Sequence, residues 1–211
     1  MFGNIYQSYK HSRNLAWIVL IDNGISSLPV DLKGLIRKLN IRIGSYYKNK
    51  ALIELLDLEQ YCNNDGFSVV VEGQWYILYN SEIRPKGRLR FTIAHELGHV
   101  LLGHNLRNQG SVFGRIQITP KNIDEMDPQQ IIEFEANIFA SRLLAPACVL
   151  HELHILDAKR IADLCGLSHS AAVYRARRLQ ELERRDAYYI SALENQVRKQ
   201  FQDFITNYHY Q

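Results

Sequence analysis

Residues 88–104 read RLRFTIAHELGHVLLGH and contain the motif His95-Glu96-Leu97-Gly98-His99. On an α-helix each residue turns by about 100°, so residues four apart lie about 40° apart on one face. The side chains of His95 and His99 can therefore reach a single metal ion. Apolar residues cover most of this helix, which predicts that it is buried, and a buried histidine pair is costly without a partner such as a metal. The alternative is a surface helix that carries these residues by chance.

Glu96 lies about 100° from His95 on the helical wheel, too far round to share the ion as an ordinary third ligand. It is well placed beside a water molecule bound to that ion. Zinc lowers the pKa of its bound water towards about 7, and a carboxylate can take the proton as the hydroxide attacks a carbonyl. The motif therefore predicts a Zn²⁺ site with Glu96 as the general base.

A catalytic zinc usually takes three protein ligands, so a third is needed. His104 lies about 180° from His95 if the helix continues, so we interpret it as a helix-end histidine that points away. A second helix is predicted downstream, in DPQQIIEFEANIFASRLLAP at residues 127–146. Asp127 is its N-cap and Pro146 its stop signal.

This second helix offers two carboxylates, Glu133 and Glu135, which face nearly opposite directions. Glu133 lies in a polar stripe with Gln130, Asn137 and Ser141, so we expect it to face water. Glu135 is flanked on the wheel by apolar residues, where an ionised carboxylate is rarely found without a cation or a hydrogen-bonding partner. We predict that Glu135 is the third zinc ligand; the alternative is a buried salt bridge with an arginine.

These two motifs together resemble the ImmA/IrrE family of zinc metallopeptidases. The matching stretches are RFTIAHELGH, EFEANIFA and LLAP, with weaker likeness upstream at residues 28–31 and 66–68, and the resemblance covers residues 15–150. It implies that His95, His99 and Glu135 bind zinc and that Glu96 is the base. It also implies a zincin-like core of the gluzincin type, and a substrate that is a helix-turn-helix repressor encoded nearby, in mobile elements or stress circuits.

The leading functional hypothesis is a zinc endopeptidase that cleaves such a repressor or an antitoxin-like partner. A different class of function is a DNA-binding regulator whose non-catalytic zinc site only stabilises the fold. Glu96 discriminates between the two, because a structural site needs no base and normally closes the fourth position. A zinc hydrolase acting on a non-protein substrate fits the same ligands and is disfavoured only by the resemblance.

Composition predicts a cytoplasmic protein. The chain has 211 residues, 46% of them hydrophobic, and a net charge of +3, which indicates neither strong nucleic-acid binding nor a membrane tether. Three widely spaced cysteines, at positions 62, 148 and 165, suit a reducing compartment. The early apolar run at residues 15–21 is too short to span a bilayer and no cleavage signal follows it.

The expected fold class is α+β and mostly helical, with a small sheet. Residues 1–146 are expected to form the metallopeptidase domain and residues 147–211 a helical C-terminal module. Helical spacing or capping predicts helices over residues 5–22 and 31–39, and alternation predicts a strand at residues 41–47. Residues 67–72 and 75–80 are rich in β-branched and aromatic residues and predict a hairpin. Residues 105–126 read as a long connection, either a lid or disordered.

Residues 157–179 resemble a helix-turn-helix, with Gly166 at the turn and Ser168 or Ser170 as the cap of the second helix. Arginines 175, 177 and 178 on that helix could touch phosphates. Acidic residues dilute the charge, so we favour a packing or substrate-docking module over direct DNA binding. Apolar spacing over residues 187–207 predicts a final helix.

Overall fold

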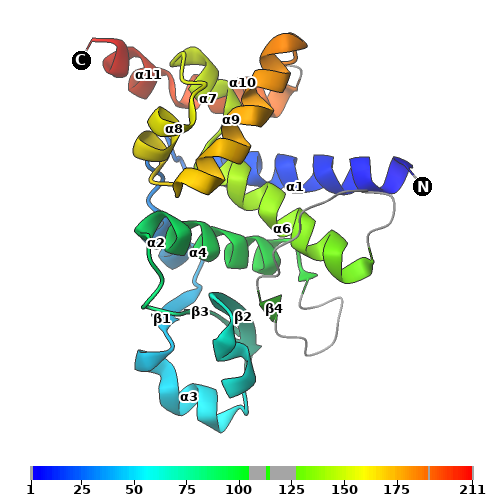
Figure 1. The fold of residues 1–211 in the computed structure, drawn as a ribbon, viewed down its shortest axis with the longest axis vertical. Helices are drawn as coiled ribbons and strands as arrows, with labels where there is room; N and C mark the ends of the chain where they lie inside the picture. Colours follow the sequence, from blue (N-terminus) through cyan, green and yellow to red (C-terminus); the bar gives the residue numbers. More distant parts are fainter. Residues whose placement is uncertain (1, 105–112, 115–126, 190, 211) are drawn as a thin grey trace.

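The computed structural model describes residues 2–104, 113–114, 127–189 and 191–210, and these are mostly helical with one small sheet (Figure 1). This confirms the α+β class. The α-helices are α1 (Phe2–Asp22), α2 (Leu32–Lys38), α3 (Lys50–Leu55), α4 (Lys86–Leu101), α6 (Pro128–Leu144), α7 (Ala147–Glu152), α8 (Ala158–Cys165), α9 (His169–Arg184), α10 (Ala192–Gln200) and α11 (Gln202–His209). Two 3-10 helices are η1 (Tyr47–Asn49) and η2 (Glu59–Asn63), and the strands are β1 (Arg42–Ser45), β2 (Gly66–Val71), β3 (Gln74–Tyr79) and β4 (Phe113–Gly114).

The four described strands form one sheet in the order β1-β3-β2-β4. Strand β1 is parallel to β3, and β2 is antiparallel to both β3 and β4. The predicted hairpin is confirmed as β2 and β3. Its two turn residues, Glu72 and Gly73, have φ of 50° and 77°, the left-handed conformations that match the twist of a tight hairpin. In the strand order of the sheet, each of the two hairpin strands has a neighbouring strand on both sides.

Helices cover both faces of the sheet (Figure 1). Helix α4 packs on one face, against β2 and β3, while α3 and η2 lie over the other. A small apolar cluster fills the second interface and contains Ile53, Leu58, Phe67 and Leu78. The sheet therefore forms the packing surface for α4, the motif helix that carries His95 and His99.

Helix α6 lies between α1 and α4 and contacts both (Figure 1). A Cβ atom added at Gly98 of α4 would lie 3.0 Å from Cδ1 of Phe139 and 3.3 Å from Cα of Ala136 on α6. Glycine costs about 1 kcal/mol of helix stability relative to alanine, and this close backbone approach is its compensation. The predicted N-cap of α6 is confirmed, because Asp127 accepts a hydrogen bond from the Gln130 amide.

The C-terminal helices pack on the start of α4. Helix α8 ends at Gly166, which has a left-handed φ of 64°, and Ser168 caps α9 by accepting from the Ala171 amide. A Cβ at Gly87 of α4 would lie 2.3 Å from the backbone nitrogen of Ser168. Arg90 Nε, also on α4, donates to the carbonyl of Cys165 at 3.1 Å. The turn between α8 and α9 is therefore held against the motif helix.

The arginines of α9 have different environments. Arg175 is buried and its Nε donates to the Ala145 carbonyl at 2.8 Å, and Arg178 pairs with Glu181 at 2.7 Å. Arg177 is exposed, with its guanidinium over the ring of Tyr174. Two of the three therefore make contacts within the fold.

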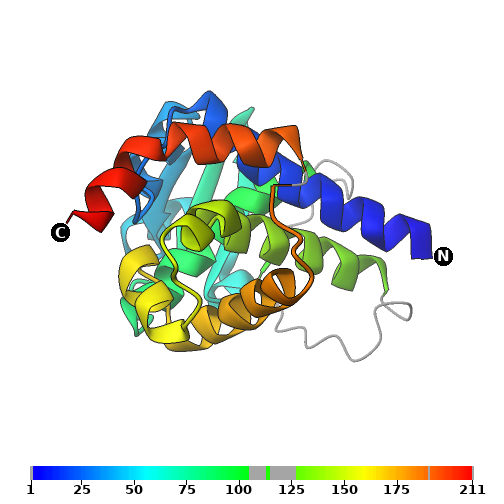
Figure 2. The ribbon, with the colours of Figure 1, turned by 90° about the horizontal axis from the view of Figure 1, so that it is seen from above.

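The single final helix expected over residues 187–207 is divided at Phe201 into α10 and α11, and α10 runs alongside α1 when the molecule is seen from above (Figure 2). Buried residues from both sides of Pro146 form one contiguous apolar cluster. Of the described helices, none combines the length and apolarity that crossing a membrane requires. The expectation of a lid or disorder at residues 105–126 falls almost wholly outside the described residues.

Candidate metal centre

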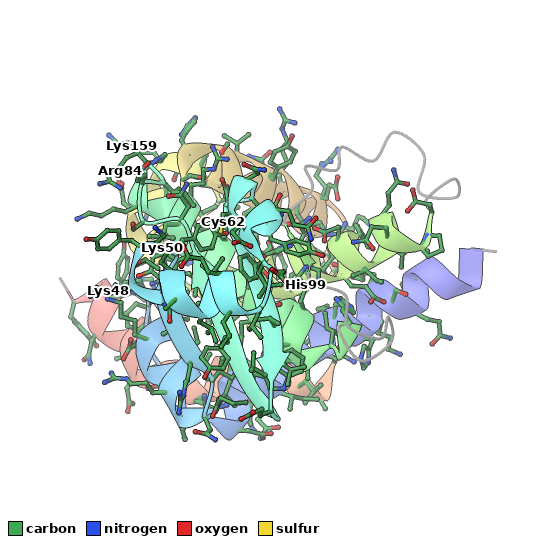
Figure 3. All side chains as sticks on the ribbon, turned by 90° about the horizontal axis from the view of Figure 1, so that it is seen from below. Lys48, Lys50, Cys62, Arg84, His99 and Lys159 are labelled. Carbon is green, nitrogen blue, oxygen red and sulfur yellow. The ribbon has the colours of Figure 1, made fainter. Side chains whose placement is uncertain are left out.

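His95 and His99 project from α4 towards Glu133 on α6, and all three side chains are fully buried. The Nε2 atoms of the two histidines lie 2.9 Å apart. Glu133 places Oε2 3.2 Å from Nε2 of His95 and Oε1 3.3 Å from Nε2 of His99. Three potential metal-ligand atoms from two helices thus converge on one point. Figure 3 shows the position of His99 from the α3 side of the molecule.

The two glutamates of α6 are arranged differently from our expectation. Glu133, expected to face water, is fully buried against the histidine pair, whereas Glu135 places Oε2 2.8 Å from Nε2 of His104. The structure therefore brings Glu133 to the histidines, in place of Glu135. Of the polar stripe on the wheel of α6, Glu133 and Asn137 therefore face the histidines of α4.

His95 is oriented by a second polar residue of that stripe. Its Nδ1 atom lies 3.1 Å from Oδ1 of Asn137, one turn along α6 from Glu133. Because an amide oxygen only accepts, Nδ1 of His95 carries the proton in this hydrogen bond. The lone pair of His95 Nε2 is then directed towards His99 and Glu133.

His104 also departs from the expected geometry. It was expected to point away from His95, but it is fully buried and its Nδ1 lies 2.9 Å from Nδ1 of His99. Helix α4 ends at Leu101, and Gly103 adopts a left-handed φ of 69°. The chain therefore turns back, and His104 meets the far side of the His99 ring.

Electrostatics favour a neutral histidine and an ionised carboxylate at the centre. Burial, helped by the nearby His95, lowers the pKa of His99 to about 4, so its imidazole is neutral at pH 7. Burial alone would raise the pKa of Glu133, but its contacts with His95 and His99 lower that pKa to about 2. Neutral imidazole and carboxylate are the forms that bind metals.

Glu96 is fully buried on the sheet side of α4. An ideal Cβ at Gly66 of β2 would lie 3.5 Å from Cγ of Glu96. Burial and the nearby Glu96 carboxylate both raise the pKa of Tyr46, whose hydroxyl donates to the Asn64 carbonyl at 3.1 Å. Tyr46 is thus an electrostatic neighbour of Glu96 that no sequence motif indicated.

The residues at the centre fit a zinc ion. Zinc bonds of about 2.0–2.2 Å in tetrahedral geometry place neighbouring ligand atoms about 3.3–3.6 Å apart. The two histidine Nε2 atoms lie 2.9 Å apart, and each lies 3.2 or 3.3 Å from one oxygen of Glu133, which is close to that spacing. Two imidazoles and one carboxylate are also the ligand types of known catalytic zinc sites, which leave a fourth position for water.

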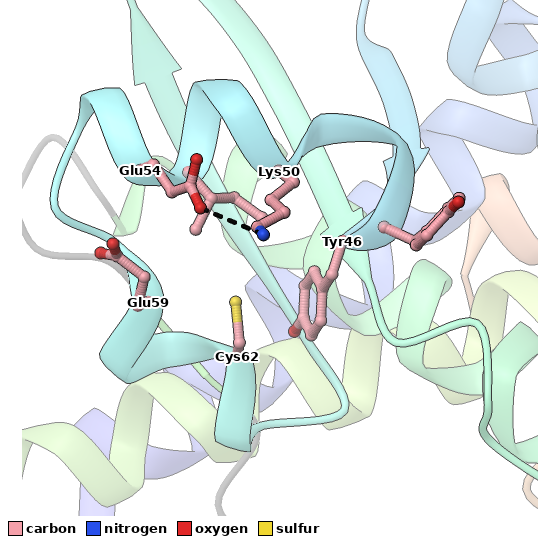
Figure 4. Close-up of a pocket in the computed structure, with 7 residues that line it drawn as sticks. Tyr46, Lys50, Glu54, Glu59 and Cys62 are labelled. Atoms are coloured by element: carbon pink, nitrogen blue, oxygen red, sulfur yellow. Dashed lines mark ion pairs between the residues drawn. The ribbon is translucent and has the colours of Figure 1, made fainter.

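A separate pocket of about 280 Å³ opens beside α3 (Figure 4). Tyr46 forms part of its wall, and an ion pair of 3.5 Å joins Lys50 and Glu54 at its edge. Cys62 also lines it. Tyr46 is therefore common to the wall of this pocket and to the electrostatic surroundings of Glu96.

Comparison with known proteins matches residues 53–177 to the family Peptidase_M78, the IrrE N-terminal-like domain. The chain is also similar to the radiation response metalloprotease IrrE of Deinococcus deserti, with 32% identity over 127 residues. That similarity covers 57% of this chain and 41% of the relative, so this chain aligns with less than half of the relative's length.

The family match includes all of α4 and α6, and therefore every residue of the candidate centre. It covers more than half of the chain, and it agrees with the resemblance carried by the two sequence motifs. The chain belongs to the IrrE N-terminal-like family of metallopeptidases.

Proposed function

We propose that this protein is a zinc-dependent endopeptidase with His95, His99 and Glu133 as the metal ligands. The observation that carries the proposal is the convergence of these three buried side chains, with the buried Glu96 directly after His95 on α4. A zinc ion held there would supply a water of lowered pKa and polarise the carbonyl of the scissile bond. The ligand set, two histidines on one helix and a glutamate on another, supports a zincin-like core of the gluzincin type.

Glu96 acts as the general base in this proposal. It follows His95 directly on α4, so its carboxylate lies beside the centre without sharing the ligand positions. It takes a proton from the attacking water and returns it to the nitrogen of the leaving amine. Because Glu96 is buried, bulk water does not compete for this proton transfer.

We propose a protein substrate, specifically a helix-turn-helix repressor or an antitoxin-like partner. Support comes from the resemblance to ImmA/IrrE peptidases and from the curated relative, which is itself a metalloprotease. A cytoplasmic location would fit such a partner. The role of the protein in a mobile element or a stress circuit rests on the same resemblance.

The alternative function, a DNA-binding regulator with a structural zinc site, has weaker support. Arg175 and Arg178 are engaged by the Ala145 carbonyl and by Glu181, so two of the three candidate phosphate contacts serve the fold. A structural site would also have no use for Glu96 next to the ligands. These observations favour the enzyme.

The decisive experiment compares the wild-type protein with Glu96→Gln. Both are loaded with zinc and incubated with any helix-turn-helix repressor found to be encoded beside the gene, and with a peptide library read by mass spectrometry. Loss of a general base typically costs about 10²- to 10⁴-fold in rate, so Glu96→Gln should keep its zinc and lose cleavage by that factor. Preparing both proteins identically controls for contaminating proteases. Cleavage by Glu96→Gln at the wild-type rate would overturn the proposal.

A further inference from the structure

We propose that His104 and Glu135 are positioning residues that fix the ring of His99, in a hydrogen-bonded chain from the Glu135 carboxylate through His104 to the metal ligand. This inference rests on the proposed zinc centre and adds two residues to it. Neither residue contributes an atom to the cluster of His95, His99 and Glu133. Both act on the metal only through His99.

The chain is continuous and buried. Oε2 of Glu135 lies 2.8 Å from Nε2 of His104, and Nδ1 of His104 lies 2.9 Å from Nδ1 of His99. His99 and His104 are fully buried and Glu135 is 4% exposed. The His99 and His104 rings meet nearly edge to face, with an interplanar angle of 71° and a centroid separation of 5.0 Å. Both nitrogens of each imidazole are thereby occupied.

The direction of the protons follows from ligation. A neutral imidazole that offers the lone pair of Nε2 to a metal carries its single proton on Nδ1. The Nδ1 atom of His104 lies 2.9 Å from that nitrogen, so in the proposed chain it accepts the proton of His99. The proton of a neutral His104 then lies on Nε2 and is donated to the Glu135 carboxylate. Each proton position fixes the next.

Metal-bound histidines usually donate their other N–H to a carboxylate, a carbonyl or water, and that contact fixes both tautomer and ring orientation. The Nδ1 atoms of His95 and His99 have different hydrogen-bond partners. His95 donates to the amide oxygen of Asn137, whereas His99 is connected to an ionisable carboxylate through a second imidazole. The carboxylate of Glu135 thus reaches His99 through one intervening ring.

The first test measures proton positions in the wild-type protein. Long-range ¹H–¹⁵N correlation spectra of the zinc-loaded, ¹⁵N-labelled protein distinguish a ring nitrogen that bears a proton from one that does not. The proposal requires the proton of His99 on Nδ1 and that of His104 on Nε2, with Nδ1 of His104 bare. A proton on Nδ1 of His104 would overturn it, and this result depends on no substitution.

The second test measures zinc affinity by competition with a chromophoric chelator, without any assay of activity. Removing a group that orients a ligand typically weakens metal binding by about 10- to 100-fold, and we expect this loss for both His104→Ala and Glu135→Ala. Because both act through one chain, the double variant should bind zinc within about threefold of the weaker single variant. Glu135→Gln keeps an acceptor oxygen and should restore most of the affinity.

Glu194→Gln is the matched control, because Glu194 is a buried acid on α10 outside the centre and its loss should leave zinc affinity unchanged. The outcomes separate the two proposals. If wild-type protein binds no zinc, the proposed centre fails. If it binds zinc and His104→Ala binds it equally well, or if the losses in the single variants add, only the positioning role fails.

Discussion

Glu133 and Glu135 are two residues apart on α6, yet they contact different histidines: Glu133 reaches the Nε2 atoms of His95 and His99, and Glu135 reaches His104. Both are buried, so burial alone does not identify a ligand. The distinction lies in which part of α4 each one faces. Glu133 meets the C-terminal half of α4, and Glu135 meets the chain just beyond its end.

This difference predicts unequal effects on zinc binding. Glu133→Gln removes the charge of a proposed ligand. We expect its zinc affinity to fall by more than 100-fold, beyond the range typical of groups that only orient a ligand. Glu135→Gln should remain within about tenfold of wild type. Chelator competition and metal analysis after dialysis provide the measurements. Equal losses in the two variants, or a greater loss in Glu135→Gln, would contradict the assignment of Glu133.

The contact between α4 and the turn that precedes α9 predicts a large effect of a single methyl group. A Cβ at Gly87 would lie 2.3 Å from the Ser168 nitrogen and 2.4 Å from the Leu167 carbonyl carbon. Alanine gains about 1 kcal/mol of helix propensity, but the backbone atoms it meets must shift, and overpacking typically costs about 1–3 kcal/mol or more. We therefore expect Gly87→Ala to lower the free energy of unfolding in urea titrations.

Lys86→Ala is the matched control for that experiment, because Lys86 is exposed at the same end of α4. Substitutions at such surface positions usually change stability by less than about 0.5 kcal/mol. A Gly87→Ala variant as stable as Lys86→Ala would show that α4 and the turn are not in contact in solution.

The three cysteines should differ sharply in reactivity. Burial raises the pKa of Cys148 and of Cys165 to about 12 and also raises the pKa of Cys62, but Cys62 is partly exposed at the pocket whereas the other two thiols are buried. Since the thiolate is the reactive form, a disulfide reagent should modify one thiol in the native protein and three after unfolding. The native reaction should disappear in Cys62→Ser. Rapid modification of a second thiol in the native state would show that the core opens.

Tyr9 of α1 should ionise near neutral pH. Burial would raise its pKa, but the guanidinium groups of Arg142 and Arg178, both hydrogen-bonded to its hydroxyl, lower it to about 7. Absorbance of tyrosinate should therefore show one tyrosine titrating near pH 7, and Tyr9→Phe should remove that step.

The same shift predicts a pH dependence of stability. Tyr9 has a lower pKa in the folded than in the unfolded state, so its contribution to stability is lost as pH falls through about 7 and is fully present above the unfolded value near 10. Wild type and Tyr9→Phe should thus differ more in unfolding free energy at pH 9 than at pH 6. A difference that does not vary with pH would contradict the lowered pKa.

Local patterns predicted most of the elements. The capping residues Asp31 and Asp127 correctly identified the starts of α2 and α6, and the β-branched and aromatic residues of 67–72 and 75–80 identified the hairpin strands. These signals are local, because a cap or a hairpin is made by residues close together in the sequence. Residues 48–63 show only some helical periodicity in the sequence, and they lie in η1, α3 and η2, short elements that pack on the sheet.

The expectation that Glu133 faces water was wrong because a helical wheel gives relative directions and not the face that meets a partner. The polar stripe of α6 was assigned to solvent, but Glu133 and Asn137 face the histidines. The position of His104 was missed because it depends on where α4 ends. Gly103, which directly precedes His104, was the sequence signal for the end of this helix.

Because the chain reverses at Gly103, the contact between His99 and His104 requires a fixed number of residues between them. Inserting or deleting one residue there would move the ring of His104 away from the ring of His99 and away from the Glu135 carboxylate. A search for chains that share this arrangement can therefore use a short fingerprint: two histidines five positions apart, with glycine immediately before the second.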